Sequence, residues 1–173
     1  MSLLLSYSQQ QAIKKISANN QSKYDQMAAE VEENELRKLL GIAFLQDVQN
    51  NPTDAANVML LDGGTFTDSN GDELRFKGLR YVLAYLNYSR YIGESFVNDT
   101  FTGFVQKTRP DSETVSEGTI KRLQNENREI ALAEWALIKK FLDIEYEDYP
   151  LWYSSRTKKP FIPRLFGVRK TEN

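Results

Sequence analysis

Carboxylates are the side chains of this sequence best suited to acid–base chemistry, because the chain contains no cysteine and no histidine. This composition excludes thiol nucleophiles, disulfides, ordinary zinc sites and imidazole bases. The candidates for an acid–base role are Asp62, Asp72, Glu73, Glu145, Glu147 and Asp148. The spacing of the candidate carboxylates fixes no pair around a substrate. Three of them, Glu145, Glu147 and Asp148, are typical of a solvated helix end. The sequence therefore predicts no enzyme, no metal site and no cofactor.

A second acidic stretch, residues 68–72, has some features of a calcium-binding loop. Counted from Asp68, however, glycine falls at position four instead of six, and Leu79 stands where a bidentate glutamate is needed. The stretch also contains Asn70-Gly71, which favours a tight hairpin turn because both turn residues need positive φ. Polar and apolar side chains alternate in the flanking residues 65–67 and 73–76, so the stretch predicts a β-hairpin over residues 65–76.

The C-terminal segment is basic and aromatic. Residues 150–171 hold six of the 22 Lys and Arg residues and none of the 24 Asp and Glu residues, so the remainder has 16 against 24, a net charge of −8. Because large aromatic side chains gain little by staying in water, we expect an extended arm over residues 144–173 that binds a partner protein. The expected contact residues are Trp152, Tyr153, Arg156, Lys158, Lys159, Phe161, Arg164, Phe166 and Arg169.

Two other interpretations of this arm stay open, a nucleic-acid contact and a solvated linker. In the first, the basic side chains contact phosphates while Trp152 or Phe161 stacks on bases. The run Phe161-Ile162-Pro163, together with Pro150 and Pro160, instead favours an extended segment that lies in a groove on a protein.

The first half of the chain predicts helices. Residues 6–21 are rich in Ser, Gln and Asn, so we expect residues 1–21 to be flexible or ordered by a partner. Residues 23–49 favour one long helix or two consecutive helices, the second capped by Asn34. Pro52 should stop this element, and Thr53 should cap a short helix over residues 55–60 that ends at Gly63.

The helix predicted over residues 79–97 is apolar on two nearly opposite sides. One side is aliphatic and the other is aromatic, and a helix apolar on two sides is covered on two sides. Two interpretations stay open: a central helix within one core, or an aromatic side that lies at a subunit interface. The aromatic side is formed by Tyr81, Tyr85, Tyr88, Ile92 and Phe96.

Ser116 should cap a helix over residues 117–143. The apolar face of that helix includes Glu134, and the aliphatic side of the preceding helix includes Arg90. We therefore expect a buried ion pair between Arg90 and Glu134, in which case Glu134→Leu would cost about 3–5 kcal/mol. The alternative is two exposed charges.

The chain of 173 residues, 40% of them hydrophobic, is long enough for one core. We expect a mainly α-helical bundle over residues 22–143 with one small β-hairpin, flanked by N- and C-terminal arms at residues 1–21 and 144–173. The apolar run at residues 3–5 is too short for a signal peptide or a membrane span, so we expect assembly in the cytoplasm and no membrane partner.

Residues 60–107 read LLDGGTFTDSNGDELRFKGLRYVLAYLNYSRYIGESFVNDTFTGFVQK and precede a long helix. This succession resembles the head-to-tail connector (adaptor) proteins of tailed bacteriophages, most closely those of phages infecting Bacteroidetes, including crAss-like phages. The shared features are a Gly-Gly turn, a small hairpin, a Gly-Leu helix start, an aromatic helix and a loop with a Thr-x-x-Gly step at residues 100–105. The resemblance covers residues 30–143.

This resemblance implies a virion protein without catalytic activity, located at the head-to-tail interface. It implies a homo-oligomeric ring, commonly a dodecamer, that binds the portal protein and a downstream tail or stopper ring. Genomic DNA would pass through its channel, and an acidic lining would let DNA slide without sticking. Residues 144–173 match no pattern of these proteins, so docking by the arm rests on its composition.

Overall fold

The computed structural model describes residues 3–17, 21–95, 97–100, 103–106 and 116–152, and the side chains at 97–106 are not described. The described chain is mainly helical, as predicted, with two small antiparallel hairpins. Its elements in order are α1 (Tyr7–Ile13), α2 (Gln21–Val31), a π-helical turn (Glu32–Leu36), α3 (Arg37–Leu40), α4 (Ile42–Asn50), α5 (Ala55–Asp62), β1 (Gly64–Thr67), β2 (Glu73–Phe76), α6 (Leu79–Ser95), β3 (Val97–Thr100), β4 (Gly103–Gln106) and α7 (Glu117–Ile144).

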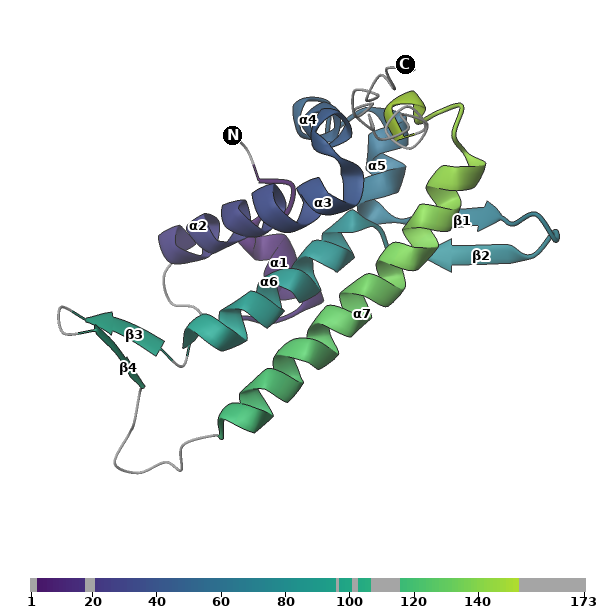
Figure 1. The fold of residues 1–173 in the computed structure, drawn as a ribbon. Coiled ribbons are helices and arrows are strands. Elements are labelled where there is room, and N and C mark those ends of the chain that lie inside the picture. The colour runs from purple at the N-terminus through teal and green to yellow at the C-terminus, as the bar shows by residue number, and fades with distance from the viewer. Residues whose placement is uncertain (1–2, 18–20, 96, 101–102, 107–115, 153–173) are drawn as a thin grey trace, which may run out of the picture.

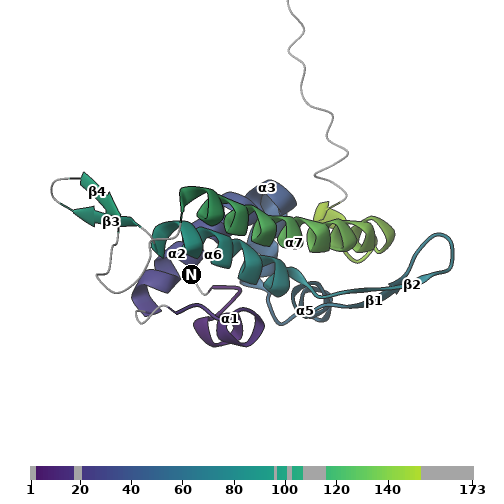
Figure 2. The same cartoon turned by 90° about the horizontal axis from the view of Figure 1, so that it is seen from below.

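Helices α6 and α7 form the central antiparallel pair of the molecule (Figure 1). Helices α2 and α3 cross beside α6, and Figure 2 shows α6 lying between α7 and α1. The aliphatic side of α6 packs into one continuous core with residues from both halves of the chain, among them Leu36, Phe44, Leu60, Phe76, Leu83, Ile138 and Phe141. The predicted coverage of α6 on two sides is therefore confirmed, since α7 and α1 lie on different sides of it.

Several predicted helix ends are confirmed, and two predicted caps are wrong. Helix α4 ends two residues before Pro52, and Ser116 caps α7 by accepting a hydrogen bond from the Thr119 amide. Asp54, rather than Thr53, occupies the N-cap position of α5. Asn34 caps nothing: it lies inside the π-helical turn and its side chain donates to the Glu30 carbonyl.

The prediction of a flexible or partner-ordered start is wrong for the described part of residues 1–21. Ser6 and Gln9 form a capping box that begins α1. Leu4 and Leu5 are buried in the main core, and the Gln10 side chain donates to the Ala84 carbonyl of α6 at 3.1 Å. The polar side chain of Gln10 thus binds the backbone of the central helix instead of solvent.

The hairpin predicted at residues 65–76 is confirmed, with Thr65 opposite Arg75 and Phe66 opposite Leu74. Its turn differs from the prediction, because only Gly71 has positive φ (90°) and Asn70 does not. The Asp68 carboxylate instead accepts the amides of Asn70 and Asp72 and so shapes the loop. A second hairpin, β3–β4, pairs residues 97–100 with 103–106 in a stretch that the sequence predicted to be a loop.

Candidate functional site

The aromatic side of α6 is half exposed beside α1. We call Tyr81, Tyr85 and Tyr88 the tyrosine row; each is partly buried, while Ile92 on the same side is buried. The Tyr81 and Tyr85 rings lie 4.7 Å apart between centroids. Tyr85 packs against the main core, and Tyr88 packs against a smaller cluster formed by Ile16, Tyr24, Met27 and Ala28. The inner edges of these rings therefore pack against buried residues, and their outer edges stay accessible to solvent. Phe96, also predicted on this side, lies outside the described residues.

Two lysines lie over the tyrosine row. Lys14, at the end of α1, places its Nζ 5.2 Å from the Tyr85 ring centroid and 4.6 Å from that of Tyr88. Lys77, just before α6, lies 4.2 Å from the Tyr81 ring centroid and donates to its hydroxyl at 3.1 Å. Ammonium groups over aromatic faces are attracted to the negative π-face, so this surface combines cations with rings.

Trp152 is a correction to the predicted arm, because it belongs to the core. It is 5% exposed, its ring lies near Phe44 and Trp135, and its indole N–H donates to the Asp143 carboxylate at 2.9 Å. Tyr149 is buried as well and donates its hydroxyl proton to the Ala56 carbonyl. Residues 149–152 thus close the helical body, and the predicted boundary at residue 144 is too early.

The other predicted contact residues of the arm lie outside the described residues. They are Tyr153, Arg156, Lys158, Lys159, Phe161, Arg164, Phe166 and Arg169. The predicted contacts of the arm therefore stay predictions, except for that of Trp152.

The predicted ion pair between Arg90 and Glu134 is wrong. Arg90 is exposed and pairs with Glu30 at 2.9 Å and with Glu94 at 2.6 Å. Glu134 is buried, as expected, but its carboxylate accepts the backbone amide of Lys77. The two residues lie on facing helices whose relative rotation cannot be obtained from a projection of each helix alone.

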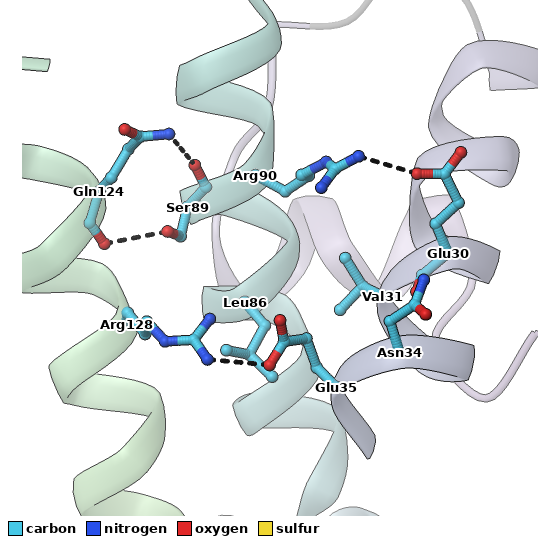
Figure 3. Close-up of a pocket in the computed structure, with 9 residues that line it drawn as sticks. All are labelled: Glu30, Val31, Asn34, Glu35, Leu86, Ser89, Arg90, Gln124 and Arg128. Atoms are coloured by element: carbon cyan, nitrogen blue, oxygen red, sulfur yellow. Dashed lines mark hydrogen bonds and ion pairs between the residues drawn. The ribbon is translucent and has the colours of Figure 1, made fainter. Parts of the chain in front are cut away.

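A pocket of about 210 Å³ lies where α2, the π-helical turn, α6 and α7 meet (Figure 3). Arg90 bridges from α6 to Glu30 of α2, and Arg128 bridges from α7 to Glu35 of the turn at 2.9 Å. The Arg128 guanidinium lowers the pKa of Glu35. Because both arginines already have carboxylate partners, the pocket holds no unpaired cation for an anionic ligand, and its exposed ion pairs join three helices.

Glu32 is a buried carboxylate that the sequence did not predict. Its carboxylate accepts the Leu4 amide at 2.8 Å and the Gln49 side chain at 3.3 Å, and the residue is 4% exposed. Burial raises its pKa, and the hydrogen bonds oppose that rise. One available signal was the five-residue spacing between Val31 and Leu36, which does not fit an α-helix that buries both.

Within the described residues, no group of three or more acidic side chains is arranged to hold a metal ion. No described helix is both long and apolar enough to cross a membrane.

Comparisons with known proteins give one family and no individual relative. The model of a family of unknown function, DUF6712, matches residues 36–162, which is most of the chain. No curated protein and no solved structure matches. The matched region begins at the end of the π-helical turn and includes the central helices, both hairpins and the buried Trp152. The chain therefore belongs to DUF6712, a family of unknown function.

Proposed function

We propose that this chain is a structural virion protein, a head-to-tail adaptor of a tailed bacteriophage. Its copies form a ring that binds the portal, joins it to the tail machinery and leaves a channel for genomic DNA. The proposal assigns no catalytic role. Its first support is the resemblance of residues 60–107 to phage adaptors, a stretch that folds as the end of α5, a hairpin, the aromatic helix α6 and a second hairpin.

The observation that carries the proposal is the contrast between the closed body and the sequence that follows it. Trp152 is held by ring contacts and by Asp143, so the described body extends to this residue. The 21 residues after it include six basic side chains and one carboxylate, Glu172, whereas the remainder of the chain is acidic. A fixed attachment point followed by a basic aromatic segment suits attachment to another protein ring.

Repetition of this segment around a ring strengthens binding. Once one arm is bound, its neighbours bind at a high effective concentration even where a single arm is weak. An acidic body also suits a channel for DNA, because like charges prevent the duplex from adhering to the wall.

Removal of residues 153–173 tests the proposal. The cut retains Trp152, so the shortened chain should unfold at the same urea concentration as the full chain. It should no longer co-sediment with the portal protein of the same phage. Full-length chain carrying Leu132→Ser, a change at an exposed position of α7 outside the arm, serves as the control. Co-sedimentation of the shortened chain at the level of the full chain would refute the proposal.

Nucleic-acid binding by the same segment is the second candidate, favoured by its six basic side chains. Because Trp152 is buried, stacking on bases would fall to Tyr153, Phe161 or Phe166. Filter binding to DNA should then weaken steeply as salt rises from about 50 to 200 mM. An absence of binding at low salt would end this alternative.

A further inference from the structure

The tyrosine row carries two ammonium groups that no described carboxylate neutralises. The ion pairs among the described residues involve other cations, and neither Lys14 nor Lys77 takes part in one. Both lysines instead lie over tyrosine rings and extend the row at its two ends. A half-exposed aromatic surface with a cation at each end fits a partner surface that combines carboxylates with apolar side chains.

The chain itself presents such a surface at the end of α7, in residues 144–148, which we call the acidic turn. Ile144 is 37% exposed and Tyr146 is 46% exposed, and both lie among carboxylates, those of Glu145, Glu147 and Asp148. The turn is held in shape by the backbone hydrogen bonds from Asp148 to Glu145 and from Tyr149 to Tyr146. The buried Tyr149 fixes its position on the body.

The two surfaces cannot meet within one molecule. The tyrosine row faces α1, whereas the acidic turn follows α7, and Figure 2 shows α6 between these two helices. Contact between them therefore requires a second copy of the chain. Because the two patches differ, the contact is heterologous: each copy offers its row to one neighbour and its turn to the other. Such contacts close into a ring when the rotation per copy permits.

We propose that the tyrosine row with Lys14 and Lys77 is the docking site for the acidic turn of a neighbouring copy. Carboxylates of the turn pair with the two ammonium groups, while Ile144 and Tyr146 cover the outer edges of the rings. This inference rests on the proposed ring and identifies its lateral contact. The site is the lysine and tyrosine surface, and the acidic turn is its ligand.

Charge reversal on each side of the contact tests the inference in the full chain. One variant carries Lys14→Glu with Lys77→Glu, and the other carries Glu147→Lys with Asp148→Lys. Like charges then face each other in every homotypic contact, so each variant alone should self-associate at least about tenfold more weakly than the unmodified chain. Sedimentation velocity across a concentration series measures this change.

A mixture of the two variants gives the decisive result. The reversed row of one variant is complementary to the reversed turn of the other, and the unchanged surfaces are also complementary. An equimolar mixture should therefore recover assembly with alternating copies. Lys38→Glu with Lys121→Glu makes the same change in net charge at exposed positions outside the contact, so it should assemble normally.

The outcomes separate this inference from the proposed function. An unmodified chain that stays monomeric at every concentration overturns the ring and the inference together. An unmodified chain that assembles, with reversal variants that assemble equally well or whose mixture does not recover, overturns the inference and leaves the ring. If a reversal variant fails to fold, Lys14→Gln with Lys77→Gln provides a milder test and should weaken association without a change in the circular dichroism spectrum.

Discussion

Glu32 shows how one residue connects distant parts of this chain. Its carboxylate receives the Leu4 amide from the N-terminal segment and the Gln49 side chain from α4. No described cation forms an ion pair with it, and burial raises its pKa above the ordinary range of a glutamate. The charged form is therefore penalised in the folded protein relative to the unfolded chain.

The pH dependence of stability should reveal this penalty. A carboxyl group whose pKa is higher in the folded state contributes stability below its unfolded pKa, and that contribution is lost as pH rises through the folded pKa. Glu32→Gln removes the titration but retains a carbonyl that can accept the Leu4 amide. We expect the variant to gain stability relative to the unmodified chain as pH rises from acidic to neutral, measured by urea unfolding at each pH.

Glu32→Ala is the matched control for the hydrogen bonds. It leaves the Leu4 amide and the Gln49 side chain without their acceptor, which should cost about 1–3 kcal/mol at all pH values. A constant difference between Glu32→Gln and the unmodified chain across the pH range would contradict the assignment of the raised pKa to Glu32.

Residue identity alone predicted burial better than it predicted partners. Glu134 lies on the apolar face of α7 and is buried, as its position indicated. Its partner, the Lys77 amide, is a backbone group whose location depends on how β2 meets α6. The basic residues that follow Trp152 predict that it belongs to the arm, whereas its contacts with Phe44 and Trp135 depend on the completed fold.

At the scale of elements, two glycines let α5 and the first hairpin meet α6. Gly63 and Gly78 have φ values of 89° and 85° and face each other across this junction. A Cβ on Gly63 would lie 2.5 Å from the Phe76 carbonyl oxygen, and one on Gly78 would lie 2.5 Å from the Gly63 nitrogen. The backbones thus approach more closely than any side chain permits.

Gly78→Ala should be far more damaging than Gly71→Ala, although both positions have positive φ. A Cβ on Gly71 meets no atom within 4 Å, so that change should cost only the left-handed penalty of about 1–2 kcal/mol. At Gly78 the clash with backbone adds to the penalty, for a total of about 2–5 kcal/mol. Thermal unfolding of the two variants measures the difference, and equal costs would show that the junction relaxes.

Local signals predicted the elements that are defined by local chemistry. Pro52, Gly63 and Ser116 each act within a few residues of an end, and the ends were placed correctly. The β3–β4 hairpin contains no Asn-Gly turn signal, so the sequence predicts a loop there. The π-helical turn was missed because its carboxylate is held by Leu4, 28 residues earlier in the sequence.

At the scale of the whole molecule, residues 3–17 form part of the body. Leu4 and Leu5 enter the main core, Ile16 enters the smaller cluster, and the Arg80 side chain donates to the Leu4 carbonyl. The tyrosine row is covered along one edge by the same segment. This part of the chain precedes the region matched by the family model, yet it covers the central helix.

Deletion of residues 2–16 should therefore destabilise the body. Loss of the two buried leucines alone should cost about 3–6 kcal/mol, at roughly 1.5–3 kcal/mol for each side chain. The measurement is urea unfolding followed by circular dichroism. Leu4→Ala with Leu5→Ala, in the full-length chain, separates the apolar contribution from the hydrogen bonds. Unfolding of the shortened chain at the same urea concentration as the full chain would contradict this role.

Composition predicted the fold class and the single body but misjudged both of its boundaries. Ser, Gln and Asn near the start indicated a solvated arm. Composition cannot predict that one of these polar side chains, that of Gln10, binds the backbone of α6. At the other end, the shift in charge predicted a boundary at residue 144, whereas the described body includes the buried Trp152.

The π-helical turn sets the buried Val31 and the buried Leu36 five residues apart, and so changes the direction in which side chains point between α2 and α3. In an uninterrupted α-helix, residues five apart are offset by roughly 140°, so the wider turn allows both side chains to face inward. Loss of one residue here would rotate Tyr24 and Met27 away from the neighbours that they now contact. The register of the π-helical turn, and not only its composition, therefore decides whether α2 can pack against the rest of the body.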